Sequence, residues 1–358
     1  MTNISPTLLD PARFAGSESG SAIGLYPLGT PGGLQAAVCN HGARLLQLVV
    51  PGRGDARHDV VLGYDHLSQM LQGMPSMGAF VGRYANRIAQ ARFTWEGRTW
   101  QLPANDGPHC LHGGPAGSRY QVFEVLSHTP DRLVLAWTFR GAQDGFPGDL
   151  ALRVTYALPA PRTLSIEWEG QALDQAGVAN FTAHPFFNLE GSEAAHAGGH
   201  HLTIDATHYL PVDAQKIPTG EIAPVDGTPL DLRAGATLEQ ALGRLPAGQG
   251  FDHCYVFHAD GSHRPLRPMA RAHAPGSGVV MQVWSDAPGL QFFSASGFDG
   301  SLPRHAGKGG RAYGPQAGFC LEPQGLPDAP NQPGFPSTVI RPGQPARGRI
   351  GYRFSVAD

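Results

Sequence analysis

The feature that most constrains the fold is a series of short apolar runs, each followed by turn residues. The clearest example is the segment 91–102, in which apolar and polar residues alternate on both sides of Glu96-Gly97. Alternation with a period of two is typical of a strand with one buried face, and a two-residue turn containing glycine commonly joins hairpin strands. The segment therefore predicts a β-hairpin.

Similar runs recur along most of the chain. We expect further strands at residues 36–39, 45–50, 59–64, 132–139, 151–158, 163–168, 281–284 and 290–293. The 48 glycines and 32 prolines fit the many turns that such strands need, and 17 phenylalanines can supply a core. Turn signals that recur roughly every 8 to 12 residues favour a sandwich or barrel. The sequence thus predicts an all-β protein, a large antiparallel β-sandwich.

Helices contribute little to this pattern. Residues 237–245 carry one apolar helical stripe, and residues 66–72 can form a short helical turn. Residues 258–277 are rich in His, Arg, Pro and Gly, which predicts a long connection between strands. Residues 1–20 are polar and predict a loose N-terminal arm. Because no repeat or linker follows, residues 21–358 are expected to form a single domain.

Composition excludes several classes of protein. A net charge of −3 favours neither a nucleic acid nor an acidic membrane surface as a partner. The widely spaced Cys39, Cys110, Cys254 and Cys320 predict buried free thiols, and no His-Glu-x-x-His motif or paired cysteines indicate a metal site. The N-terminal residues lack a basic and apolar leader pattern, and no apolar run approaches about 18 residues. A cytoplasmic protein is therefore expected.

A carboxylate near the end of the chain is the first candidate for chemistry. The apolar run 317–321 stops at Glu322, and Pro323 pushes the residue before it into an extended conformation. We expect Glu322 to close a strand. Loss of solvation there would raise the pKa of Glu322 and suit it to proton transfer near neutral pH. A surface glutamate that happens to follow a strand is the alternative.

Two histidines are further candidates. His184 lies in a strongly apolar stretch before Pro185, and a buried neutral imidazole needs partners for both nitrogens. His112 stands between Leu111 and two glycines, which allow close approach by a ligand or another strand. For both residues, a histidine that only supports the structure is the alternative.

Polar residues at expected loops and strand ends could bind hydroxyl groups. Asn86 and Arg87 lie in the polar segment 82–88, directly before the predicted hairpin. Asp252 opens the apolar run 252–257. A solvated loop and a capping aspartate are the alternatives, and the residues alone leave both open.

Several motifs together resemble the aldose 1-epimerase family, which is also called galactose mutarotase. They occur in sequence order over roughly residues 20–355, at 82–88, 102–114, 184–189, 209–220, 251–253 and 321–338. The resemblance implies a galactose mutarotase-like supersandwich with a sugar site in a groove lined by strand ends. It implies interconversion of the α and β anomers of a free aldose such as galactose or glucose, without metal or redox cofactor. It also implies a small-molecule partner and a monomer or weak homodimer.

The resemblance assigns roles to individual residues. Glu322 would be the general base, His184 the general acid, and His112 would orient the sugar near its ring oxygen. The residues expected to hold sugar hydroxyls are Asn86, Arg87, Asp252 and Gln291. Ring opening removes the proton of the C1 hydroxyl while the ring oxygen gains one. We therefore expect Glu322 to be ionised and His184 protonated, with pKa values that bracket the working pH.

The sequence departs from the family pattern near these residues. Cys110 stands where a second histidine is common, Ala183 replaces a common Asn, and Pro185-Phe186 follows His184 where a hydroxyl residue and a Tyr are frequent. More apolar surroundings should lower the pKa of His184. These changes bear on sugar preference and rate.

Three alternatives to this function remain open from the sequence. A hexose-6-phosphate 1-epimerase of the same fold would need additional arginines directed at a phosphate. A non-catalytic sugar-binding protein need not keep Glu322 and His184 together. A glycosidase would need two carboxylates at a defined separation, which Asp252 and Glu322 could supply.

Overall fold

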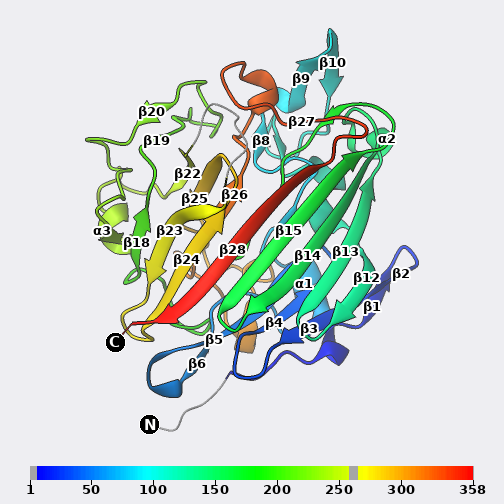
Figure 1. The fold of residues 1–358 in the computed structure, drawn as a ribbon. Helices are drawn as coiled ribbons and strands as arrows, with labels where there is room; N and C mark the ends of the chain where they lie inside the picture. The colour runs from blue at the N-terminus through cyan, green and yellow to red at the C-terminus, as the bar shows by residue number, and fades with distance from the viewer. Residues whose placement is uncertain (1–5, 258–264, 358) are drawn as a thin grey trace.

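The computed structural model describes residues 6–257 and 265–357, and it is built mainly of antiparallel strands (Figure 1). Its largest sheet has nine strands. In spatial order they are β12 (Glu124–Thr129), β13 (Arg132–Phe139), β14 (Leu150–Ala160), β15 (Thr163–Ala172), β28 (Ala346–Val356), β24 (Val279–Ser285), β23 (Arg267–His273), β18 (His201–Ile204) and β21 (Ala236–Thr237).

A second layer lies behind this sheet. It contains a five-stranded sheet of β20 (Ala223–Pro224), β19 (His208–Tyr209), β22 (Asp252–Val256), β25 (Gly289–Phe293) and β26 (Cys320–Gln324). It also contains a four-stranded sheet of β3 (Leu25–Gly29), β4 (Gln35–Cys39), β5 (Arg44–Pro51) and β6 (Arg57–Asp59). Bridges from Val61 to Phe187 and from Phe187 to Phe319 connect the two sheets.

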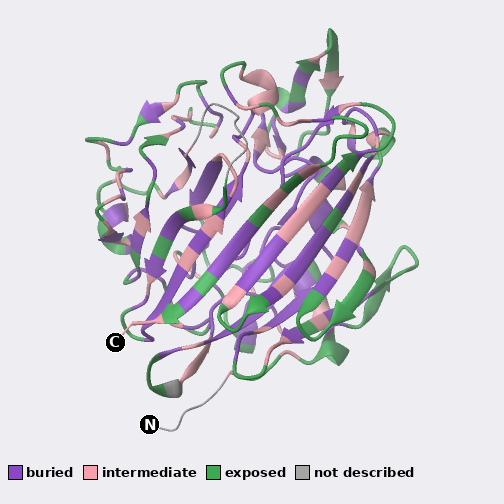
Figure 2. Cartoon of the chain, viewed as in Figure 1, coloured by how far each residue is buried: buried purple, intermediate pink, exposed green. Residues whose placement is uncertain are grey.

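The main core fills the space between the two layers. Buried residues alternate with exposed ones along the long strands (Figure 2), as in β14, where Leu152 and Val154 are buried and Arg153 is exposed. Across the layers, the rings of Phe187 and Tyr352 lie 5.0 Å apart. The prediction of a large antiparallel β-sandwich is confirmed.

Smaller elements complete the described part of the fold. The two-stranded sheets pair β1 (Gly16–Glu18) with β2 (Ser21–Ile23), β9 (Arg92–Trp95) with β10 (Arg98–Gln101), β8 (Arg87–Ile88) with β11 (Cys110–Leu111), β7 (Phe80–Val81) with β17 (Thr182–Ala183), and β16 (Gly177–Val178) with β27 (Val339–Ile340). The α-helices are α1 (Leu67–Gln72), α2 (Gly141–Asp144) and α3 (Leu238–Leu242). Short 3-10 turns cover Pro11–Phe14, Arg53–Asp55, Ala89–Ala91, Gly114–Ala116, Ser118–Tyr120, Lys308–Gly310 and Ala329–Asn331.

Most of the predicted elements are present. The segment 91–102 forms the hairpin of β9 and β10, and Glu96 and Gly97 adopt the positive φ angles of its turn. The two predicted helices correspond to α1 and α3. All four cysteines are buried and free, as expected. Among the described residues, none of the helices has the length and apolar character that crossing a bilayer requires.

The structure corrects two of the predicted segments. The strand expected at 59–64 ends at Asp59, whose carboxylate accepts a hydrogen bond from the Leu48 N–H and pairs with Lys308. The connection expected at 258–277 contains β23, a strand of the large sheet. The earlier part of that prediction, residues 258–264, lies outside the described residues.

The structure also corrects the expected loose arm and the expected position of Glu322. Within the arm, Phe14 is buried, and Gly16–Glu18 form β1. Glu322 lies in the middle of β26, which continues through Pro323. Because β26 is an edge strand of its five-stranded sheet, it tolerates a proline that lacks the backbone N–H.

Candidate functional site

A cavity of about 630 Å³ opens at the ends of several of these strands. This volume lies within the range of roughly 300–1,000 Å³ that is typical of small-molecule sites. All seven residues selected from the sequence line it, namely Asn86, Arg87, His112, His184, Asp252, Gln291 and Glu322. Segments that are more than 200 positions apart in the sequence therefore contribute to one site.

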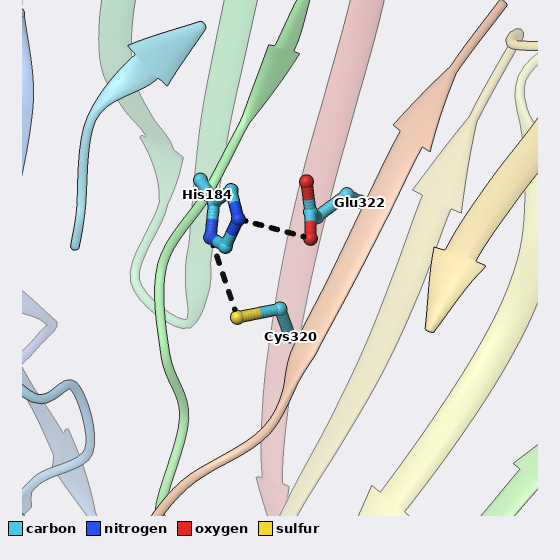
Figure 3. Close-up of side chains that lie close together, drawn as sticks. All are labelled: His184, Cys320 and Glu322. Atoms are coloured by element: carbon cyan, nitrogen blue, oxygen red, sulfur yellow. Dashed lines mark hydrogen bonds and ion pairs between the residues drawn. The ribbon is translucent and has the colours of Figure 1, made fainter. Parts of the chain in front are cut away.

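Glu322 and His184 face each other in this cavity (Figure 3). His184 Nε2 lies 3.4 Å from Glu322 Oε1, and His184 Nδ1 lies 3.4 Å from the Sγ of Cys320, two residues before Glu322 on β26. Both side chains of the pair are almost completely buried. The ring of Phe186 stacks on the imidazole at a centroid distance of 5.0 Å, which closes off one face of His184.

Burial shifts the pKa values of this pair in opposite directions. Desolvation raises the pKa of Glu322 well above its ordinary value, and the charge of Asp252 adds to this effect. Desolvation lowers the pKa of His184 to about 3, and the nearby guanidinium groups of Arg119 and Arg44 also oppose its protonation. The expected lowering of the His184 pKa is confirmed. Burial of both groups therefore opposes the expected charged form of the pair, an ionised Glu322 with a protonated His184.

His112 is held in one tautomer by its backbone neighbour. Its Nδ1 accepts a hydrogen bond of 3.1 Å from the backbone N–H of Asn86. Burial and the charges of Arg119, His184 and Arg87 lower the pKa of His112 well below its ordinary value. A neutral imidazole that accepts at Nδ1 carries its proton on Nε2. His112 is therefore a fixed N–H donor in the cavity.

A close approach of the backbone holds His112 in place. A Cβ atom at Gly113 would lie 2.4 Å from the carbonyl oxygen of Gly82, so this position requires glycine. The Asn105 side chain accepts from the Leu111 N–H at 2.7 Å and donates to the Leu111 carbonyl at 3.0 Å. Gly113, one of the glycines predicted to allow a close approach, thus lets its backbone pack against that of Gly82.

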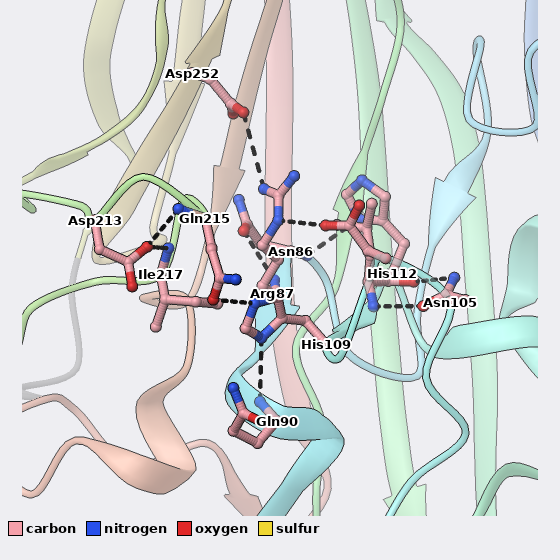
Figure 4. A network of polar contacts seen from close by, with 12 residues as sticks. Asn86, Arg87, Gln90, Asn105, His109, His112, Asp213, Gln215, Ile217 and Asp252 are labelled. Carbon is pink, nitrogen blue, oxygen red and sulfur yellow. Dashed lines mark hydrogen bonds and ion pairs between the residues drawn. The ribbon is translucent and has the colours of Figure 1, made fainter.

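A network of paired charges, which includes Arg87 and Asp252, lines the same cavity as Glu322 and His184 (Figure 4). Arg87 Nε donates to Asp106 Oδ2 at 2.7 Å, and Arg87 Nη1 lies 3.8 Å from Asp252 Oδ2. Asp252 Oδ1 accepts from Gln291 Nε2 at 2.7 Å, which leaves the buried Gln291 Oε1 without a hydrogen-bond partner within the described chain. An unsatisfied acceptor that lines a cavity is available to a ligand hydroxyl.

Sequence reasoning missed several residues in or beside the cavity. Cys320 was interpreted only as a buried thiol, although it contacts His184 from behind the cavity lining. Ser76, Arg119 and Arg304 line the cavity and had no predicted role. The only signal for Arg119 was its place in the polar stretch Ser118-Arg119-Tyr120, which is indistinguishable from a surface loop.

His184, Cys320 and Glu322 form a group that could in principle hold a metal ion. Their potential ligand atoms all lie within 4.8 Å of one another. Burial raises the pKa of the Cys320 thiol well above its ordinary value, as it does for Glu322. Since metal ligation requires the deprotonated thiol and carboxyl groups, this environment favours the proton-bearing forms over a metal.

Comparisons with known proteins identify the family of this chain. The model of the family described as aldose 1-epimerase matches residues 24–353. The galactose mutarotase of Bos taurus is 39% identical over 328 residues, which cover 90% of this chain and 92% of the relative. The aldose 1-epimerase of Escherichia coli is 30% identical over 343 residues, which cover 94% and 97%.

Solved structures resemble the whole fold. A crystal structure of an aldose epimerase homologue from C. elegans superposes with a TM-score of 0.87 at 30% identity, covering 94% of this chain and all of that one. A galactose 1-epimerase from Lactobacillus acidophilus has the same fold, with a TM-score of 0.81 at 22% identity, 96% of this chain and 97% of that chain being covered. With a family model that spans nearly the entire chain, this protein belongs to the aldose 1-epimerase family.

Proposed function

We propose that this protein is an aldose 1-epimerase that interconverts the α and β anomers of free aldoses such as galactose and glucose. The observation that carries the proposal is the buried pair of Glu322 and His184, 3.4 Å apart, in a cavity lined with hydroxyl-binding groups. A protein that only bound sugars would have no need for a carboxyl and an imidazole with shifted pKa values at this place.

Ring opening requires one proton to leave the C1 hydroxyl and one to reach the ring oxygen. In the resting neutral pair, Glu322 carries a proton and His184 Nε2 faces it as an acceptor. Transfer of that proton gives the carboxylate and the imidazolium. Glu322 then takes the C1 hydroxyl proton while His184 donates to the ring oxygen, and the C1–oxygen bond of the ring breaks. The open aldehyde forms and the pair is neutral again.

Ring closure on the other face reverses these transfers. The aldehyde rotates about the C1–C2 bond, so its oxygen takes the opposite orientation. His184 removes the proton from the ring-forming hydroxyl as the hydroxyl oxygen attacks C1, and Glu322 protonates the aldehyde oxygen. The imidazolium then returns its proton to the carboxylate, so each half-reaction begins and ends with the neutral pair and burial disfavours only the transient ion pair. Each positioned proton transfer contributes about 10²–10⁴-fold.

The remaining groups hold the sugar in position. The Nε2–H of His112 is directed at the ring oxygen, where it stabilises developing negative charge. Gln291 Oε1 accepts from a sugar hydroxyl, and Asn86, Arg87 and Asp252 bind further hydroxyls. Because Asp252 is already engaged by Gln291 and Arg87, its carboxylate suits hydroxyl binding better than the second acid of a glycosidase.

We also propose that the protein acts as a monomer or weak homodimer in the cytoplasm, and that no nucleic acid or membrane is a partner. We propose in addition that the chain forms a single domain, to which β1 belongs through its pairing with β2. Four free buried thiols suit a reducing compartment, and a net charge of −3 gives no electrostatic attraction to nucleic acid. Size-exclusion chromatography with light scattering would test the oligomeric state, with a mass near 38 kDa or twice that value expected from the 37.9 kDa chain.

Polarimetry tests the reaction itself. Freshly dissolved α-galactose and α-glucose change rotation as they approach anomeric equilibrium, and wild-type protein should accelerate this change over a buffer blank. An unchanged decay of rotation for both sugars would contradict the proposal, and sugar binding without turnover would then be the better reading.

A further inference from the structure

Arg119 is a buried cation in the wall of the cavity. Only 5% of it is exposed, and it lines the same cavity as Glu322 and His184. Its Nη1 donates to the hydroxyl of Ser76 at 2.9 Å, its Nη2 donates to the Leu111 carbonyl at 3.3 Å, and its guanidinium lies 4.9 Å from the ring of Tyr120. A guanidinium has five N–H donors, and these two hydrogen bonds leave donors available to a ligand.

No carboxylate of the described residues forms an ion pair with Arg119. Burying a cation without an opposite charge is costly, so the position requires an explanation. Burial lowers the pKa of Arg119, and Tyr120 and the charge of Asp106 act in the opposite direction. Arg304, an exposed residue that also lines the cavity, adds a second positive charge.

Two other buried arginines use their terminal nitrogens in contacts within the protein. Arg44 donates to three backbone carbonyls, and Arg83 donates to two carbonyls and contacts Asp144. Neither lines the cavity. Arg87 lines it but is paired with two aspartates. Arg119 therefore differs from all three, because it faces the cavity without an acidic partner.

Arg119 lies close to His112, because its Nη2 donates to the carbonyl of Leu111, the residue before His112. Under the proposed function, on which this inference rests, His112 faces the ring oxygen. The ring carbon on the other side of that oxygen from C1 carries the exocyclic group of a hexose. We propose that Arg119, with Ser76 and Arg304, forms a subsite for an oxyanion on that exocyclic carbon, either a carboxylate or a phosphate.

Kinetics on matched sugars test the subsite. Wild-type kcat/KM for mutarotation would be measured with galactose, galacturonate and galactose 6-phosphate. We expect the protein to convert at least one of the two anionic sugars with a kcat/KM equal to or above that for galactose. A higher kcat/KM for galacturonate would identify the oxyanion as a planar carboxylate, and a higher kcat/KM for galactose 6-phosphate would identify it as a tetrahedral phosphate. In Arg119→Gln, the ratio of anionic to neutral kcat/KM should fall about 10–100-fold, as for loss of a charge-assisted hydrogen bond.

Two further variants complete the series. Arg304→Gln should lower the same ratio by only about 2–5-fold, because Arg304 is exposed and its charge is screened. The matched control is Arg353→Gln, on an exposed position of β28 in the large sheet, which should leave the ratio unchanged.

The outcomes separate the subsite from the reaction. Two outcomes would overturn the subsite alone, provided that the wild type is active on galactose. In the first, kcat/KM for both anionic sugars is less than a tenth of that for galactose. In the second, the ratio of anionic to neutral kcat/KM is the same in Arg119→Gln as in the wild type. A wild-type protein that accelerates no sugar would overturn the proposed function and the subsite with it. If Arg119→Gln does not fold, inhibition of galactose mutarotation by inorganic phosphate, measured at constant ionic strength, tests the subsite instead. Phosphate should then compete with galactose in the wild type and less well in Arg304→Gln, and absence of competition would overturn the subsite.

Discussion

The cavity contains two groups of polar side chains that handle charge in different ways. The pair of Glu322 and His184 is almost fully buried, and burial favours its uncharged form. Beside it, Arg87 is ion-paired with Asp106 and Asp252, and these side chains keep 14–36% of their surface exposed (Figure 4). The first group is suited to moving protons, whereas the second is suited to holding hydroxyls through charge-assisted hydrogen bonds. Substitutions in the two groups should therefore have different kinetic signatures.

The largest effect is expected in the buried pair. Glu322→Gln keeps the size of the side chain but removes its ability to exchange a proton. We expect kcat on galactose to fall by about 10³-fold with little change in KM, because general acid–base catalysis contributes about 10²–10⁴-fold. The matched control Glu124→Gln, on an exposed position of β12, should retain wild-type rates in polarimetry. A Glu322→Gln variant with nearly normal kcat would remove the distinction between the two groups.

His112 lies at the boundary between the groups, and its replacement should have the next largest effect. His112→Phe removes the N–H donor and leaves the backbone N–H of Asn86 without an acceptor. Loss of a buried hydrogen bond costs roughly 1–3 kcal/mol, so kcat/KM should fall about 10–100-fold. The exposed His208 offers a control as His208→Phe. A decrease in stability, measured by urea denaturation, that came without a change in kcat/KM would reduce His112 to a structural role.

The paired network should respond mainly in KM. Arg87→Gln leaves Asp106 and Asp252 without their cation, and we expect KM to rise about 10-fold while kcat changes less. Arg140→Gln breaks an exposed ion pair with Asp149, neither of which lines the cavity, and should leave both constants near wild type. A decrease confined to kcat in Arg87→Gln would place Arg87 with the proton-transfer group instead.

The smallest effect is expected at Cys320. Its Sγ lies 3.4 Å from His184 Nδ1, so Cys320→Ala should loosen the imidazole and lower kcat about 3-fold, with KM nearly unchanged. Cys39 is equally buried and, like Cys320, is not part of the cavity lining, so Cys39→Ala controls for the loss of a buried thiol. Equal kcat values in the two alanine variants would show that the sulfur contact does not position His184.

Local features of this protein could be predicted from its sequence because neighbouring residues determine them. The hairpin of β9 and β10 depends on alternation and on the Glu96-Gly97 turn, which all lie in one short segment. β23 was missed because its Arg, Pro and His residues resemble a loop, although pairing with β18 and β24 makes it a strand. Similarly, contacts with Leu48 and Lys308 set the environment of Asp59, where the strand expected at 59–64 ends.

In the site, too, some properties could be predicted from neighbouring residues and others depend on contacts between distant parts of the chain. Its seven predicted residues line one cavity, but the resemblance to a family, and not local pattern, supplied their roles. The protonation of the pair depends on burial and on Arg119 and Arg44, which are distant in sequence from Glu322 and from His184. The environment of Arg119 is unusual because no carboxylate of the described residues forms an ion pair with it. Such properties follow from three-dimensional packing, and no spacing in the sequence encodes them.

The pH dependence of kcat/KM on galactose tests most directly whether the buried pair works as a neutral unit that shares one proton. Adding a second proton requires charging His184, whose pKa is about 3, and removing the shared proton requires ionising Glu322, whose pKa is well above its ordinary value. The active, singly protonated form should therefore persist from about pH 4 upward until Glu322 ionises. After subtraction of the buffer blank, we predict a profile that is flat from about pH 4 and falls only as Glu322 ionises. A decline in kcat/KM as the pH rises through 6.5, the ordinary pKa of histidine, would show that an independently protonated His184 is the acid and would contradict the neutral pair.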